Sequence, residues 1–176
     1  MRFSVRKLVL MGVLTAAALI IFIFEAQIPL PVNAPGIKLG LANAVTLFAL
    51  FLGAKEIDGR LPVSFAFMIL VCRIVLGALL TGRVIAFAYS LSGGLLAFAV
   101  MAVMRRFVSD KQIWVCGAFG AMFHNIGQIC AAMVITGIPA VAAYLPALIA
   151  AGVITGAVTG FVAQFALARL RIGGFA

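Results

Sequence analysis

Long apolar runs, separated by short segments that carry most of the charge, constrain this chain more than any other feature. A helix rises 1.5 Å per residue, so about 20 apolar residues cross the ~30 Å hydrocarbon core of a bilayer. Six runs have this character, and they cover Leu8–Ile28, Leu39–Ala54, Pro62–Leu80, Val84–Met104, Ile113–Ile135 and Val141–Leu167. We expect each run to form a helix. The second run is the shortest of the six.

Composition excludes an ordinary soluble domain. Hydrophobic residues make up 66% of the 176 residues, against about half in soluble domains, and only four residues are acidic. We therefore predict an all-α integral membrane protein with one transmembrane domain over residues 1–176 and six transmembrane helices. A signal peptide is the competing interpretation of the first run, but the run is long and no small-x-small cleavage pattern lies between Glu25 and Pro31.

The basic residues predict the orientation. Ten of the 13 Lys and Arg residues lie at the two ends of the chain and in the second-to-third and fourth-to-fifth connections. Lys38 and Arg83 lie in the other connections, and Arg73 lies inside a run. By the positive-inside rule, both termini are cytoplasmic and Lys38 faces outward. Basic residues scattered in this way do not form the continuous patch typical of nucleic-acid binding.

The segment Pro35–Asn43, PGIKLGLAN, predicts a polar mouth between the first two helices. The prolines in the preceding stretch 28–31 cannot continue a helix, because proline lacks an amide donor and disfavours the α conformation of the residue before it. Gly36 and Gly40 allow the backbone to turn before the second helix begins. Lys38 and Asn43 are thus placed at the outer end of the helices.

Two spans carry strongly polar residues near the bilayer midplane. Arg73 lies eleven residues past Pro62, about 16 Å into its helix, and His124 lies at a similar depth. An intramembrane arginine costs about 2.5–3.5 kcal/mol on insertion scales, so Arg73 needs a partner or a watered cavity. Either Arg73 pairs with Glu25, or it contacts a ligand. His124 either bonds to a neighbouring helix or contacts the same ligand, and Gln128 shares its helix face.

These polar residues form the predicted solute-binding site. Its members share a position at the outer ends of the helices or near the midplane, and they are Glu25, Lys38, Asn43, Arg73, Tyr89, His124, Asn125 and Gln128. The alternative for Tyr89 is an aromatic anchor at the membrane surface. Fixed cations outnumber anions in this set, which favours a carboxylate, a phosphate or a similar group as the ligand.

Small residues at four-residue spacing predict close helix contacts. Gly152, Gly156 and Gly160 have this spacing in the sixth run, where we expect packing inside the bundle. Gly12 and Ala16 have it in the first run, where a docking surface for another membrane protein is the favoured interpretation and internal packing is the alternative.

Motifs for catalysis or metal binding do not occur in the sequence. It has no Walker-type G-x-x-x-x-G-K-[ST] motif and no paired carboxylates, and its two aspartates, Asp58 and Asp110, stand apart. Cys72, Cys116 and Cys130 form no C-x-x-C pair, and we interpret them as packing residues. We expect neither catalysis nor a metal or other cofactor.

Several segments together resemble a known family. IPLPVNAPGIKLGLANAVTLFAL, RIVLGALLTG with Arg73, YSLSGGLLAFAVM, HNIGQ and YLPALIAAGVITGAVTG are similar to the Gx transporter family of small bacterial membrane proteins, often labelled heptaprenyl diphosphate synthase component I. That family is in turn similar, more loosely, to the S-components of energy-coupling-factor (ECF) transporters.

The looser resemblance implies a subunit in the bacterial cytoplasmic membrane that captures a small solute from outside. It also implies two kinds of partner, a transmembrane coupling subunit and cytoplasmic ATPases. The synthase label implies a rival function, a non-catalytic membrane accessory subunit of a polyprenyl diphosphate synthase, because the chain lacks the Asp-rich motifs of such enzymes. A self-sufficient channel or carrier is less favoured, since the inner halves of the helices offer little polar lining.

Overall fold

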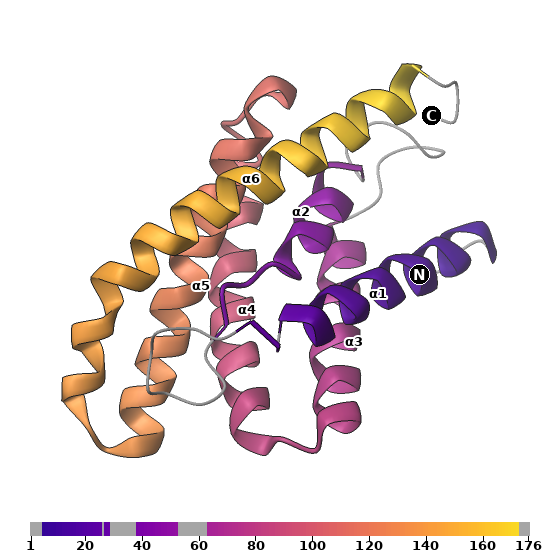
Figure 1. Ribbon diagram of the computed structural model, residues 1–176. Coiled ribbons are helices and arrows are strands. Elements are labelled where there is room, and N and C mark those ends of the chain that lie inside the picture. The colour runs from indigo at the N-terminus through magenta and orange to yellow at the C-terminus, as the bar shows by residue number, and fades with distance from the viewer. Residues whose placement is uncertain (1–4, 26, 29–37, 53–62, 173–176) are drawn as a thin grey trace.

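The computed structural model describes residues 5–25, 27–28, 38–52 and 63–172, and within these residues it contains helices and no strand. The six α-helices are α1 (Val5–Glu25), α2 (Asn43–Leu52), α3 (Val63–Thr81), α4 (Val84–Met104), α5 (Ile113–Thr136) and α6 (Leu145–Ile172), as Figure 1 shows. Short 3-10 helices, η1 (Asp110–Gln112) and η2 (Pro139–Tyr144), precede α5 and α6. The all-α class predicted from the sequence is confirmed.

Five of the helices are long and apolar enough to cross a membrane, which is consistent with a multi-pass membrane protein. The shorter helix is α2, whose ten described residues rise about 15 Å. It begins at Asn43 rather than at the predicted Leu39, because Gly40 has a positive φ of 82° and a turn precedes the helix. Residues 53–62, where the second helix was predicted to end and the third to begin, lie outside the described residues.

Other boundaries also differ from the prediction by a few residues. The first helix ends at Glu25 instead of Ile28, since the Gln27 amide already bonds back to Phe24 in a turn. The sixth segment begins with the 3-10 helix η2 and continues as α6 to Ile172, beyond the predicted Leu167.

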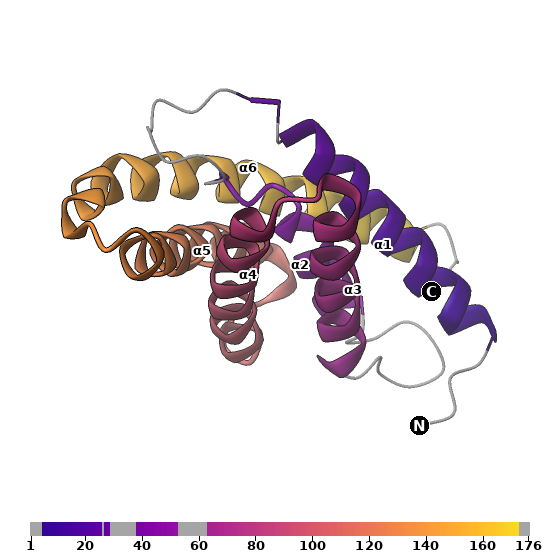
Figure 2. The same cartoon turned by 90° about the horizontal axis from the view of Figure 1, so that it is seen from below.

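The helices form two layers with α2 between them. In Figure 2, α1 and α6 lie on one side of the bundle, and α3, α4 and α5 lie on the other. α2 packs against all five other α-helices, and eight of its ten residues are buried. It is the central helix of the fold, which explains why it is apolar on every side.

The predicted internal packing of the α6 glycines is confirmed. A methyl group added at Gly156 would lie 2.5 Å from the carbonyl oxygen of Gly117, and one at Gly160 would lie 2.6 Å from Cα of Trp114. α5 and α6 therefore cross at backbone contact. Gly12 on α1 differs, because a methyl group there would meet nothing within 4 Å.

The ends of the bundle agree with helices that alternate in direction. The α3–α4 and α5–α6 connections lie at one end, at the bottom of Figure 1. The α4–α5 connection and the C-terminal end of α6 lie at the other end. The polar residues predicted for the site come from elements that converge between these ends.

Candidate functional site

Glu25, the last residue of α1, joins that helix to the segment that leads into α2. Its side chain is buried, and Oε1 accepts hydrogen bonds from the backbone amides of Gly40 and Leu41. These amides precede the first turn of α2, where N–H groups lack intrahelical partners and the helix dipole favours negative charge. The carboxylate thus caps the approach to α2 and holds it against α1.

Lys38 lies in the same segment and is tethered on two sides. Its Nζ donates to the carbonyl oxygen of Phe22 at 3.4 Å and lies 3.1 Å from the centroid of the Phe22 ring. Its backbone N–H donates to Oε1 of Gln128 on α5 at 3.1 Å. Burial lowers the pKa of Lys38 from 10.5 to about 8, although the charge of Glu25 opposes this shift. The amine therefore stays largely protonated at neutral pH.

Arg73 is the most deeply placed cation. It lies on α3 with 2% of its surface exposed, and Nη2 donates to Oδ1 of Asn43 at 3.3 Å. Within the described residues, Arg73 makes no direct ion pair with Glu25, whose Oε1 is bonded to backbone amides. The hypothesis that Arg73 is only the salt-bridge partner of Glu25 is therefore not supported by the contacts.

Glycines bring His124 and Gln128 of α5 against the other site residues. A methyl group at Gly40 would lie 2.8 Å from Cδ2 of His124 and 3.1 Å from Nδ2 of Asn43. One at Gly93 of α4 would lie 2.9 Å from Nδ1 of His124 and 2.9 Å from Cγ of Gln128. The side chains of the site are therefore packed against backbone on two sides.

We call the six residues joined by these contacts the polar cluster, and they are Glu25, Lys38, Asn43, Arg73, His124 and Gln128. All six are buried. The structure thus brings together six of the eight residues predicted from the sequence, from α1, α2, α3, α5 and the segment before α2.

Four nitrogen atoms of the cluster are buried and have no hydrogen-bond partner among the described residues, namely Asn43 Nδ2, Arg73 Nε, His124 Nδ1 and Gln128 Nε2. The contacts fix which atoms these are. Arg73 can only donate, so Asn43 presents its oxygen to Arg73 and its NH₂ group is the unpartnered one. The Lys38 amide likewise selects the oxygen of Gln128.

Buried N–H donors are rarely left unpaired, because each costs about 1–3 kcal/mol. Three of the four nitrogens are donors in any protonation state, and His124 Nδ1 is a donor in one of its two tautomers. Two cations and one carboxylate lie in the same cluster. An anion with several acceptor oxygens is the group that matches this surplus of donors and positive charge.

The two other predicted residues lie beside the cluster. Asn125 donates to the carbonyl oxygen of Leu148 on α6, so its recorded contact joins two helices. Tyr89 packs with Ile129, Ala132 and Leu148 in a separate apolar group. Both are buried, and each lies within one helical turn of a cluster contact.

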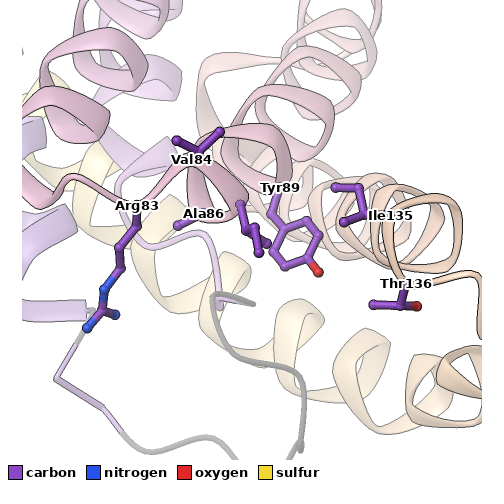
Figure 3. Close-up of a pocket in the computed structure, with 7 residues that line it drawn as sticks. Arg83, Val84, Ala86, Tyr89, Ile135 and Thr136 are labelled. Atoms are coloured by element: carbon purple, nitrogen blue, oxygen red, sulfur yellow. The ribbon is translucent and has the colours of Figure 1, made fainter.

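Tyr89 also lines an open groove between α4 and the end of α5. This groove has a volume of about 610 Å³, and it is lined by Arg83, Val84, Ile85, Ala86, Tyr89, Ile135 and Thr136. Figure 3 shows the Tyr89 ring directed toward Ile135 and Thr136, while the Arg83 side chain extends away from them. The lining is mostly apolar, with one cation and two hydroxyl groups.

Sequence reasoning missed the glycines and the backbone groups of the site. Gly93 and Gly94 allow α4 to approach the cluster, and Phe22 supplies both a ring and a carbonyl oxygen to Lys38. The adjacent buried glycines in YSLSGG were the available signal, since glycine inside a helix is unfavourable unless another group needs the space. Within the described residues, no group of three His, Cys, Asp or Glu side chains could hold a metal ion.

Fold and site together define an all-helical protein of membrane-spanning character with a buried, donor-rich polar cluster at its centre. Residues 14–166 match the family model described as heptaprenyl diphosphate synthase component I, and the chain belongs to that family. No curated protein and no solved structure is significantly similar to the chain. The family resemblance seen in the sequence is confirmed, and the looser likeness to S-components stays a prediction.

Proposed function

We propose that this chain is a non-catalytic membrane subunit that binds a small polar or anionic organic solute from outside and passes it inward with partner proteins. The observation that carries the proposal is the buried cluster. It contains two cations, several N–H donors without a partner, and one carboxylate that is already hydrogen-bonded to backbone amides. Such an arrangement is matched by a carboxylate or phosphate group. The partners are a transmembrane coupling subunit and cytoplasmic ATPases, and the location is the bacterial cytoplasmic membrane.

The test uses protein purified from native-like membranes, from which bound small molecules are released by denaturation and identified by mass spectrometry. We expect an anionic solute in the parent and in an Arg106→Met control, because Arg106 is exposed near the end of α4. We expect none in Arg73→Met. A parent protein that retains no anion under any condition would remove the basis of the proposal.

The proposed docking surface for the coupling subunit is the face of α1 that carries Gly12 and Ala16. Both residues are exposed, and in the described part of the chain α1 packs mainly against α2 and α3. Changing both to Leu should abolish co-purification of the partner while solute binding is kept, since bulky side chains block a close helix crossing. Equal loss of folding and binding would instead identify this face as internal packing.

The proposed orientation has both termini and Lys111 in the cytoplasm and Lys38 and Arg83 outside. Single cysteines at positions 83 and 111, in a background without the three native cysteines, should label from opposite sides of intact cells. Labelling of position 111 from outside would reverse the orientation and place the solute site on the cytoplasmic side.

The family description favours a second candidate, an accessory membrane subunit of a heptaprenyl diphosphate synthase. A diphosphate is also an anion with many acceptor oxygens, so the cluster is compatible with this role. Prenyl chain elongation should be measured for a soluble synthase alone, with the parent protein and with Arg73→Met. Elongation that requires the parent and fails with the variant would support the synthase role over transport.

A further inference from the structure

The groove between α4 and α5 lies along the same two helices that contact the polar cluster further along. On α4, Tyr89 lies four residues, or one turn, from Gly93, which contacts His124 and Gln128. On α5, Thr136 lies eight residues, about 12 Å, from Gln128. Groove and cluster are therefore neighbouring sections of one helix–helix seam.

The cations at the groove and in the cluster differ in burial. Arg83 at the groove is exposed, Lys38 is 8% exposed and Arg73 is 2% exposed. Arg83 lies close enough to Lys38 that its positive charge opposes protonation of that amine. Positive charge lining a path with low-dielectric walls concentrates anions and raises their rate of association.

Tyr89 separates the two sections. Its side chain is 3% exposed, it lines the groove, and it packs with Ile129 and Ala132 of α5. Gly93 and Gly127 hold α4 and α5 at backbone contact, so a path beside this contact requires the Tyr89 side chain, rather than the helices, to move.

We infer that the groove between α4 and α5 is the route by which an anion reaches the polar cluster, with Arg83 as its first cationic contact and the Tyr89 ring as the barrier. This inference rests on the proposed function, because it needs an anion that binds the cluster. It assigns the groove to a small organic anion rather than to a lipid or a protein segment. The apolar lining lets the organic part of the solute pass, and the cations select its charge.

The first test measures the charge selectivity of the groove with thiol reagents. Thr136→Cys, in a background without native cysteines, is treated with the anionic sulfonatoethyl and the cationic trimethylammonioethyl methanethiosulfonates. We expect the ratio of anionic to cationic reaction rates to exceed that of free cysteine. Arg83→Gln should lower this ratio by about threefold or more, because a single nearby charge acts on both reagents in opposite directions.

The matched control is Lys111→Gln, which removes one positive charge beyond the opposite end of α5. That helix has 24 residues, so the distance is about 36 Å, several Debye lengths at physiological salt. The control should leave the ratio unchanged. An equal effect of both variants, or no effect of Arg83→Gln, would overturn the assignment of Arg83.

The second test asks whether the groove leads to the cluster. A Gln128→Cys thiol should react with the anionic reagent about tenfold more slowly when Thr136→Trp fills the groove, and faster when Tyr89→Ala removes the barrier. The control Val158→Trp lies at an exposed position on α6 and should change nothing. If neither Thr136→Trp nor Tyr89→Ala changes the rate at which the Gln128→Cys thiol reacts with the anionic reagent, anions take another route.

The two proposals fail in different ways. If no anion binds the cluster but the thiol rates follow the groove variants, the proposed function is wrong and the route is still open to anions. If an anion binds the cluster and the groove variants leave the thiol reaction rates unchanged, only the proposed route is wrong. Should Gln128→Cys not fold, the charge ratio at Thr136→Cys still decides the role of Arg83.

Discussion

Replacing Arg73 by lysine and by methionine separates a ligand-binding role from a structural one. Arg73 is 2% exposed, and its recorded hydrogen bond is a long one, 3.3 Å to the neutral oxygen of Asn43, while Nε has no partner. Losing this bond should cost about 1 kcal/mol of stability. Lysine keeps the charge but replaces the planar fork of five N–H donors by a point charge.

The effect on binding should be much larger than the effect on stability. An anion held by two N–H groups of Arg73 loses one charge-assisted hydrogen bond in Arg73→Lys, worth about 1.5–3 kcal/mol, so its affinity should fall roughly 10- to 100-fold. Arg73→Met should abolish binding and leave stability similar, because a desolvated charge that lacks a direct ion pair is removed along with its hydrogen bond.

The assay is the dissociation constant of the identified solute together with the thermal unfolding midpoint, for the parent, Arg73→Lys, Arg73→Met and the exposed controls Arg106→Lys and Arg106→Met. We expect the Arg106 variants to match the parent in both quantities. The reasoning is refuted if Arg73→Lys binds as tightly as the parent while Arg73→Met loses about 3–5 kcal/mol of stability, the cost of breaking a buried ion pair.

Three further predictions follow from the contacts. Glu25→Ala should destabilise the protein by about 2 kcal/mol, because it leaves two backbone amides unpaired. In a double-mutant cycle with Arg73→Ala, the two losses of stability should add to within about 1 kcal/mol. A double mutant that regains most of the lost stability would instead indicate a direct ion pair. Burial lowers the pKa of Lys38 to about 8, so anion affinity should fall as the pH rises past 8. Folding stability should instead rise with pH between 8 and 10.5, because the unfolded chain binds more protons in this range. An affinity that does not change with pH would contradict a charged Lys38 in the site. Gly156→Ala should lower the thermal unfolding midpoint, since its methyl group would lie 2.5 Å from a backbone atom. Gly12→Ala should leave the midpoint unchanged or raise it slightly, because its methyl group would meet nothing within 4 Å. Equal changes of the midpoint in both variants would contradict the close α5–α6 crossing.

Depth counting along apolar runs predicted the centre of the site. Arg73 and His124 were placed at similar depth from helix rise alone, and the four-residue spacing put Gln128 beside His124 on one face. These three residues do lie in the polar cluster. The count works because a membrane-spanning helix fixes the position of each residue along one axis.

The rotation of each helix could not be predicted in the same way. Asn125 follows His124 directly and was assigned to the same site, but successive residues differ by about 100° around a helix, and Asn125 faces α6. α5 is buried on more than one side, so an apolar pattern could not show which polar residue faces which neighbour. Cys130, five residues after Asn125, is exposed although packing was predicted for it.

The role of α2 was also hidden by its composition. A helix that is apolar on every side is either in contact with lipid or surrounded by protein, and the sequence alone does not distinguish these cases. Its contacts do, because α2 packs against all five other helices and eight of its ten described residues are buried. Asn43 therefore lies at the start of a helix that is surrounded mainly by protein.

The position of α2 explains how the proposed anion site could be accommodated inside so apolar a bundle. The helix begins at the buried Asn43, so the positive end of its dipole lies at the cluster. Glu25 already occupies the amides of Gly40 and Leu41, and this carboxylate offsets one of the two cations, Lys38 and Arg73. One positive charge and the unpartnered side-chain donors are left, and the cost of keeping them buried decreases when an anion supplies acceptors. The binding energy of the proposed anion would therefore come from satisfying groups that the fold has already desolvated.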